Sequence, residues 1–219
     1  YNFDEDYTAH IPYINVERSE LDFVNRQFFN SFENTYTITP ISEIENDRLA
    51  FLPILISLKD GKKVVITEAN LEDYPGTYLM KSMEENSLRG IHAPYPKTEV
   101  QGGHNMLQSV VKERENFIAR IQGTRELPWR CMVISTEDKE LANNDMVYRL
   151  AAPSRVEDVS WIVPGKVAWE WWNAWNIKNV DFESGINNET YKHYIDFASE
   201  YGIEYVILDE GWAVNKKLI

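Results

Sequence analysis

Two patterns of hydrophobic residues divide this chain. From its start to about residue 155, short apolar or alternating runs recur without sustained helical periodicity. An alternation of apolar and polar residues is typical of half-buried strands. The runs are Asp22–Phe29, Thr35–Thr39, Ala50–Leu58, Lys63–Glu68, Phe117–Gln122 and Trp129–Ser135. We therefore expect an antiparallel β-sandwich over residues 1–155.

The clearest local signal in this part is Asp60-Gly61, which lies between the apolar runs Ala50–Leu58 and Lys63–Thr67. Asp-Gly between two β-rich runs is a strong hairpin signature, because a type I′ turn needs positive φ at both central residues. The pattern therefore predicts a β-hairpin with a type I′ turn. Met106–Phe117 fits either a short helix or a strand interrupted by charges.

The pattern changes after Pro153 to strand, helix, strand. Val167–Trp172 and Tyr205–Leu208 are apolar runs, and between them Asn187 or Asn188 can cap a helix that Gly202 ends. One apolar face of this helix is formed by Tyr191, Tyr194, Ile195 and Ala198. A parallel strand pair with a crossover helix is the economical interpretation. Such a pair cannot bury its own faces, so we expect residues 156–219 to open a barrel that later residues or another chain complete.

The composition of the chain limits the kinds of partner and site that it can have. The 219 residues carry a net charge of −13, which argues against nucleic acid, since phosphate binding requires clustered Lys and Arg. No apolar run reaches about 18 residues, so no membrane span is expected. Cys131 is the single cysteine, which excludes an intrachain disulfide and a zinc cluster of cysteines. Aromatic residues make up 13% of the chain, which fits either sugar-stacking platforms or an aromatic core.

The candidate substrate-binding residues are Trp172, Asp209, Glu210 and Trp212, which lie at or beyond the ends of the two predicted strands. In a barrel of alternating strands and helices the chemistry sits at these C-terminal strand ends. Each tryptophan either stacks on a sugar or packs as core, and Trp212 is the best candidate for a sugar contact. Adjacent strand residues point to opposite faces, so Asp209 and Glu210 cannot be an acid and base that flank one bond. Each of them either hydrogen-bonds sugar hydroxyls or is a structural carboxylate.

Three separated motifs carry a resemblance to a known family. They are ITEANLEDYPGTYL at 66–79, TRELPWRCMVI at 124–134 and the stretch from VPGKVAWEWWNAWNI to LDEGW. Over roughly residues 20–219 the chain resembles glycoside hydrolase family 97, which contains bacterial α-glucosidases and α-galactosidases of the Bacteroides type. The resemblance implies an N-terminal β-sandwich, a catalytic (β/α)8 TIM barrel and a C-terminal β domain. It also implies a periplasmic or exported protein.

The resemblance implies a calcium ion at the active site, held mainly by glutamates from the N-terminal domain and from barrel loops. Glu68, in Ile66-Thr67-Glu68-Ala69, matches the N-terminal ligand. Calcium takes six to eight oxygen ligands, so one sandwich glutamate could reach a neighbouring domain. The alternative is a solvated glutamate at a strand end. The family's catalytic carboxylates lie on later strands, so we expect no catalytic residue in this chain and place them beyond Ile219.

The function that the resemblance implies is a calcium-dependent, exo-acting α-glycoside hydrolase, and we favour a retaining α-galactosidase. One alternative is an inverting α-glucosidase of the same family. Another is a non-catalytic fragment that binds carbohydrate or a protein partner. The expected partners are an oligosaccharide or α-glycoside substrate and the remainder of the protein's own barrel, with no nucleic acid and no membrane.

Overall fold

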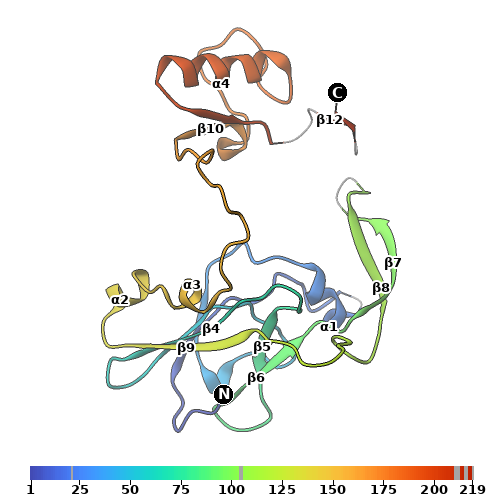
Figure 1. Ribbon diagram of the computed structural model, residues 1–219, viewed down its shortest axis with the longest axis vertical. Helices are drawn as coiled ribbons and strands as arrows, with labels where there is room; N and C mark the ends of the chain where they lie inside the picture. The colour runs from blue at the N-terminus through green and yellow to red at the C-terminus, as the bar shows by residue number, and fades with distance from the viewer. Residues whose placement is uncertain (21, 104–105, 210–212, 215–216, 219) are drawn as a thin grey trace. The chain divides into compact units, whose positions relative to one another are not determined.

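A computed structural model describes residues 1–20, 22–103, 106–209, 213–214 and 217–218. The chain forms two compact units (Figure 1). The first comprises Tyr1–Val100 and Val110–Pro153, and the second comprises Gln101–Ser109 and Ser154–Ile219. Within the described ranges, no helix is both long and apolar enough to cross a membrane.

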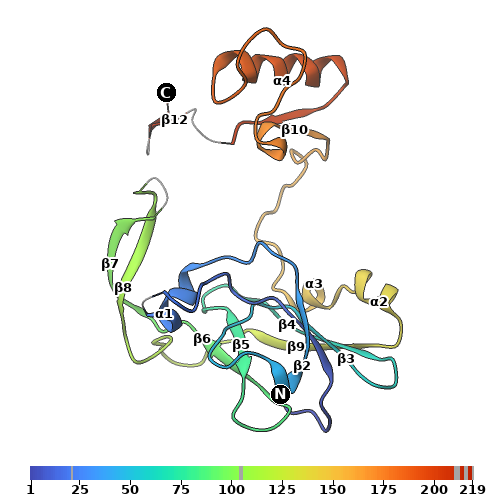
Figure 2. The same ribbon diagram turned by 180° about the vertical axis from the view of Figure 1, so that it is seen from behind.

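The first unit is built on a five-stranded sheet in the order β2-β1-β3-β4-β9, visible from both sides in Figures 1 and 2. All neighbouring strands in it are antiparallel. The strands are β1 (Thr8–Ile11), β2 (Thr37–Pro40), β3 (Ile54–Ser57), β4 (Lys63–Ala69) and β9 (Trp129–Ser135). Strands were predicted from sequence at β2, β3, β4 and β9, and in β3, β4 and β9 buried residues alternate with more exposed ones.

The main apolar cluster of this unit lies on one face of the sheet. A second hairpin, β5 (Thr77–Lys81) with β6 (Leu88–His92), adds Leu79 and Leu88 to the apolar cluster. The cluster's buried residues are Ala9, Ile11, Tyr13, Ile41, Ile44, Ala50, Ile54, Ile56, Val64, Ile66, Leu79 and Leu88. Two antiparallel layers that share an apolar interior are consistent with a β-sandwich.

The remaining elements before Pro153 are a third hairpin and several short helical segments. A third hairpin pairs β7 (Pro96–Gly102) with β8 (Gln108–Arg114). It resolves the ambiguous segment Met106–Phe117 as a strand. The helical elements are α1 (Phe23–Arg26), η1 (Gln27–Phe29), η2 (Ile41–Glu43), α2 (Asp138–Ala142) and α3 (Met146–Leu150).

Two strand predictions in the first unit were wrong. The segment Asp22–Phe29 folds as α1 and η1, because Gln27 is buried there and its side chain bonds the backbone of Asp47 and Leu49. The segment Phe117–Gln122 contains no strand and belongs to the loop that precedes β9. Its apolar side chains therefore do not alternate across a sheet.

The predicted hairpin between β3 and β4 is confirmed, with Ser57 paired to Lys63. The predicted turn type was wrong. Within the turn at residues 59–62, Gly61 alone has positive φ, at 85°, whereas a type I′ turn would also need it at Asp60. A longer connection with one left-handed glycine satisfies the twist of the two strands without a type I′ turn.

The second unit contains a parallel pair, β10 (Val167–Trp169) and β11 (Tyr205–Ile207), joined through helix α4 (Asn188–Glu200). The predicted helix boundaries are confirmed. The Asn187 side chain accepts a hydrogen bond from the Thr190 N–H at 2.9 Å, and Gly202 has φ of 63°. A short antiparallel pair, β12 (Ala213–Val214) with β13 (Lys217–Leu218), follows.

The first predicted strand of this unit, Val167–Trp172, is too long. Strand β10 ends at Trp169, and the 3-10 turn η4 (Glu170–Asn173) follows it. The paired strands remain open to solvent, since Val167, Tyr205 and Ile207 are 45%, 42% and 47% exposed. This exposure agrees with the physical argument that a parallel pair cannot bury its own faces. The assignment of residues 156–219 to a (β/α)8 barrel remains a prediction.

Candidate functional site

The C-terminal ends of β10 and β11 bring together Trp169, Glu170 and Asp209. The Asp209 backbone N–H donates to Glu170 Oε1 at 2.7 Å, and Trp169 Nε1 donates to Asp209 Oδ1 at 3.2 Å. Both the backbone and the side chain of Asp209 are therefore held by residues at the end of the neighbouring strand. Asp209 itself is exposed, so its carboxylate is accessible at this edge of the second unit.

The turn after β10 explains why Glu170 takes this position. Trp169 pairs with Ile207 as the last residues of the parallel ladder, and the chain then enters η4. The N–H of Asp209 follows just beyond the paired region. The Glu170 carboxylate supplies the acceptor for this N–H, so a side chain adds one hydrogen bond where the backbone ladder has stopped.

Glu170 is only 1% exposed, which is unusual for a carboxylate. Its second oxygen, Oε2, is buried and receives no hydrogen bond from the described residues. No cationic side chain within the described ranges forms an ion pair with Glu170. Sequence reasoning did not select Glu170. The available signal was a single acidic residue inside the apolar run VAWEWW.

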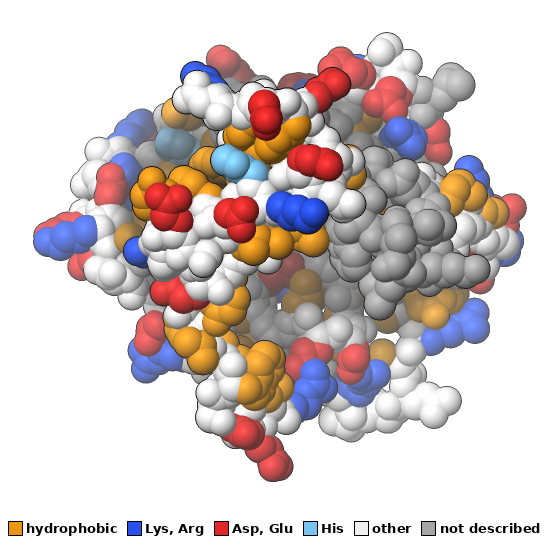
Figure 3. Space-filling model, turned by 90° about the horizontal axis from the view of Figure 1, so that it is seen from above, with side chains coloured by type: hydrophobic (Ala, Val, Ile, Leu, Met, Phe, Trp, Pro, Cys, Tyr) orange, Lys and Arg blue, Asp and Glu red, His pale blue; other side chains and the backbone are white. Residues whose placement is uncertain are grey.

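The predicted aromatic contact Trp172 lies in η4 and is 84% exposed. The strand alternation used to orient it does not apply, because β10 has already ended. Its exposure shows that it is not core within this unit. The face drawn in Figure 3 likewise shows hydrophobic side chains exposed among acidic and basic ones. Its role in substrate binding remains a prediction.

Polar residues of the same turn stabilise its local structure. Asn173 Nδ2 donates to the Asn176 carbonyl at 2.8 Å, and Tyr194 Oη donates to Asn173 Oδ1 at 2.9 Å. These contacts link the turn to helix α4. The predicted site residues Glu210 and Trp212 lie outside the described residues, so of the predicted substrate-binding set the structure places Trp172 and Asp209.

In the first unit, Glu68 lies on β4 directly opposite Arg130 of β9. Its oxygens accept hydrogen bonds from the Thr77 N–H at 3.1 and 3.2 Å, and Oε2 pairs with an Arg130 guanidinium nitrogen at 3.1 Å. The Glu68 side chain is 14% exposed and that of Arg130 is 33% exposed. Glu68 is therefore a paired, largely buried carboxylate rather than a solvated one.

This arrangement fits a calcium ligand only in part. A carboxylate is the donor that calcium prefers, but calcium needs six to eight oxygens. No group of three or more His, Cys, Asp or Glu residues that could hold a metal ion occurs in the described part of the chain. The Arg130 guanidinium also balances the charge of Glu68 and would repel a cation placed at the same oxygen. The described residues alone do not make a calcium site, and Glu68 as one ligand remains a prediction.

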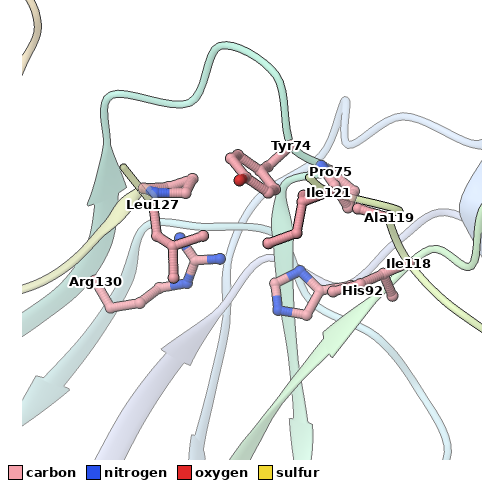
Figure 4. A pocket seen from close by; sticks show the side chains of 9 residues that line it. Tyr74, Pro75, His92, Ile118, Ala119, Ile121, Leu127 and Arg130 are labelled. Atoms are coloured by element: carbon pink, nitrogen blue, oxygen red, sulfur yellow. The ribbon is translucent and has the colours of Figure 1, made fainter. Parts of the chain in front are cut away.

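A pocket of about 420 Å³ lies beside Arg130 in the first unit (Figure 4). Figure 4 shows side chains from separate segments converging there, with Tyr74 and Leu127 near His92 and Arg130. The lining residues are Tyr74, Pro75, His92, Ile118, Ala119, Ile121, Leu127, Pro128 and Arg130. Sequence reasoning missed this pocket, because the loop that supplies Ile118 and Ile121 was read as a strand.

Burial determines the protonation state of the Cys131 thiol, next to Arg130 in the sequence. Burial raises the pKa of Cys131, with the Arg130 charge opposing this change. Cys131 is 4% exposed, and the raised pKa keeps its thiol protonated at neutral pH. Cys131 therefore behaves as a small core residue, as its place in an apolar run indicates.

The family follows from comparison with known proteins. Residues 1–153 match the family model described as Glycosyl-hydrolase 97 N-terminal, and residues 171–218 match the model described as Glycoside hydrolase 97. This chain belongs to glycoside hydrolase family 97. The resemblance found in the sequence motifs is thereby confirmed.

Two proteins named as galactosidases are similar in sequence to this chain. The retaining alpha-galactosidase of Bacteroides thetaiotaomicron is 57% identical over 215 residues, which are 98% of this chain and 32% of that protein. A probable retaining alpha-galactosidase of Streptomyces bingchenggensis is 32% identical over 146 residues, which are 63% of this chain and 21% of that protein.

Solved structures of the family also match. A Pseudoalteromonas family 97 enzyme in complex with acarbose is 25% identical, with a TM-score of 0.65, over 97% of this chain and 28% of that chain. A structure from the same source in complex with panose is also 25% identical, with a TM-score of 0.63, over 94% and 27%. The chain thus spans about a third or less of the length of these relatives.

Proposed function

We propose that the whole protein containing this chain is an exo-acting α-glycoside hydrolase of the retaining α-galactosidase type. The observation that carries the proposal is the 57% identity, over 98% of this chain, to a retaining alpha-galactosidase. A retaining glycosidase places two carboxylates about 5–5.5 Å apart across the scissile bond, one as nucleophile and one as acid and base. The β10–α4–β11 segment would then be the opening unit of the (β/α)8 catalytic barrel.

Within that enzyme the residues of this chain would support the site rather than perform the chemistry. Glu170 is buried and bonded to a backbone N–H, and Asp209 accepts a hydrogen bond from Trp169. The burial of Glu170 keeps it from flanking a glycosidic bond, and we assign the exposed Asp209 to substrate binding rather than to the chemistry. We place the catalytic carboxylates beyond Ile219, Asp209 on a sugar hydroxyl, and Trp172 as an aromatic contact for the sugar.

The activity test compares hydrolysis of a nitrophenyl α-galactoside with that of the matching α-glucoside. We expect the full-length protein to prefer the galactoside and to release the α-anomer first, as read by proton NMR. Preference for the glucoside with release of the β-anomer would support the inverting α-glucosidase instead. The 219-residue chain alone should show no turnover, and turnover by it would contradict the placement of the catalytic carboxylates.

We also propose that the full-length enzyme binds calcium, with Glu68 supplying one ligand and the others coming from outside the described residues. When bound, the ion would fix carboxylates and polarise the substrate or a water molecule. EDTA should lower the activity and calcium should restore it. Glu68→Gln should weaken calcium binding in a titration. Glu45, which pairs with Arg18 and Arg48, offers a matched control, since Glu45→Gln should leave calcium affinity unchanged.

Unchanged calcium affinity in Glu68→Gln would remove Glu68 from the ligand set and leave it as the counter-ion of Arg130.

The family resemblance further supports a periplasmic or exported enzyme. Fractionation of the source cells, with activity measured in each fraction, tests this location. Recovery of the activity in the cytoplasmic fraction would contradict it.

A further inference from the structure

Two glutamates tie β10 to β11, one at each end of the pair. At the N-terminal end, the Lys166 N–H donates to Glu204 Oε2 at 2.7 Å. At the C-terminal end, the Asp209 N–H donates to Glu170 Oε1, also at 2.7 Å. The two bonds have the same chemistry and length, but Glu204 is exposed and Glu170 is 1% exposed.

Because Glu170 is buried, its hydrogen bond at the C-terminal end costs more desolvation free energy than the bond of the exposed Glu204. A carboxylate removed from water without a cation loses hydration that one hydrogen bond restores only in part. Glu204 can make the same bond while it keeps its contact with water. The burial of Glu170 therefore calls for a role that the Glu204 arrangement does not need, and its position at the C-terminal strand ends indicates that role.

The contacts of Glu170 lead directly to Asp209. Glu170 fixes the Asp209 backbone, and the preceding residue, Trp169, donates to the Asp209 side chain. The two contacts come from consecutive residues, the last of β10 and the first of η4, so the orientation of the exposed Asp209 carboxylate depends on the point where β10 ends. A shift of about 1 Å in a group that contacts substrate can reduce a rate about a hundredfold.

We propose that Glu170 is a positioning residue, whose buried carboxylate holds the Asp209 backbone so that the Asp209 side chain meets a sugar hydroxyl. The proposal rests on the proposed glycosidase function. Glu170 does not touch the substrate and acts through Asp209. Glu204, at the opposite end of the same strands, has no such role, because the N-terminal face of a barrel serves stability.

The test uses the full-length enzyme and kcat/KM for a nitrophenyl α-galactoside. Glu170→Met removes the acceptor at nearly constant volume and should lower kcat/KM by about tenfold to a hundredfold. Glu170→Asp retracts the carboxylate and should give a loss in the same direction. Glu170→Gln keeps a carbonyl acceptor for the Asp209 N–H and should retain kcat/KM within about threefold. The matched control Glu204→Met should leave kcat/KM unchanged.

A double-mutant cycle separates positioning from general support of the fold. If Glu170 acts through Asp209, Glu170→Met should cause little further loss in an Asp209→Ala background. An equal further loss there would overturn the proposal, as would equal losses from Glu170→Met and Glu204→Met.

Hydrogen exchange distinguishes a failure of this proposal from a failure of the proposed function. Exchange at the Asp209 amide should accelerate in Glu170→Met and stay protected in Glu170→Gln, whether or not the protein hydrolyses the galactoside. Unchanged protection of the Asp209 amide in Glu170→Met would show that Glu170 does not hold it, and the proposal would then be wrong.

Discussion

Among the described residues, each unit has a largely buried glutamate near a strand end, and the two differ in how their charge is balanced. Glu68 in the first unit pairs with Arg130 and accepts hydrogen bonds from the Thr77 N–H. Among the described residues, the Glu170 side chain accepts a hydrogen bond from the Asp209 N–H at Oε1, and its Oε2 has no donor.

The described contacts account for the burial of the Glu68 carboxylate but not for the burial of Glu170 Oε2. The partners of Glu68 lie on β9 and β5, so the first unit satisfies this residue by itself. The second unit leaves Glu170 Oε2 without a donor in its described residues. A buried polar group in that state requires a role or a partner elsewhere in the protein. The contacts of Glu68 therefore contribute to stability whether or not it also binds calcium, whereas those described for Glu170 leave a functional role as the explanation of its burial.

The largest effect that this comparison predicts is on stability in the first unit. Glu68→Ala leaves the Arg130 charge without its partner and the Thr77 N–H without an acceptor. We expect a loss of about 2–3 kcal/mol in the local free energy of opening, reduced from the value for a fully buried pair because Arg130 is partly exposed. Hydrogen exchange at amides of β4 and β5 measures this loss.

The Glu45 pair supplies the control for that measurement. Glu45 bonds Arg18 and Arg48 on a more exposed surface, where ion pairs contribute about 0–1 kcal/mol. Glu45→Ala should therefore change exchange far less than Glu68→Ala. Equal losses from the two variants would show that the burial of Glu68 adds nothing, and the contrast with Glu170 would then lose its basis.

Sequence reasoning succeeded where the deciding interactions are local. Helix α4 was predictable because the Asn187 side chain caps it by accepting from the N–H of Thr190, three residues later, and Gly202 ends it with a left-handed φ. Strand β9 was predictable because its alternating residues meet one buried face. These signals depend on neighbours in the chain, which the sequence shows directly.

The site was less predictable because its contacts join distant segments. Glu68 meets Arg130 only through the register of β4 and β9, and no local pattern encodes that pairing. Glu170 was read as part of a strand, since the run VAWEWW is apolar and aromatic apart from this residue, whereas β10 ends at Trp169 and η4 begins at Glu170. The acidic residue inside that run was the one sign of a different structure.

A smaller effect is expected at acid pH, on the hydrogen bond between the Lys166 N–H and the exposed Glu204 carboxylate in the second unit. The hydrogen bond from the Lys166 N–H lowers the pKa of Glu204 below its ordinary value of 4.5. A lowered folded-state pKa gives stability that is present above the unfolded pKa and is lost as the pH falls through the folded pKa. The difference in amide exchange between the wild type and Glu204→Gln around Lys166 should therefore shrink as the pH drops below about 4.5. A constant difference down to acid pH would contradict the contribution of this ionised carboxylate.

The smallest expected effect is at Tyr74, beside Arg130 in the pocket of the first unit. Its hydroxyl is buried and makes no hydrogen bond with the described residues, whereas the Arg125 guanidinium lies over its ring at 5.4 Å. Tyr74→Phe keeps the ring and the cation–π contact and removes the unpartnered hydroxyl, so local stability in the full-length protein should not fall by more than about 0.5 kcal/mol. Amide exchange in the Tyr74 segment measures this change. A loss of more than about 1 kcal/mol would show that another part of the protein supplies the hydroxyl with a partner. In that case an unsatisfied buried group would not by itself mark function, and the argument for Glu170 would rest on its contact with Asp209 alone.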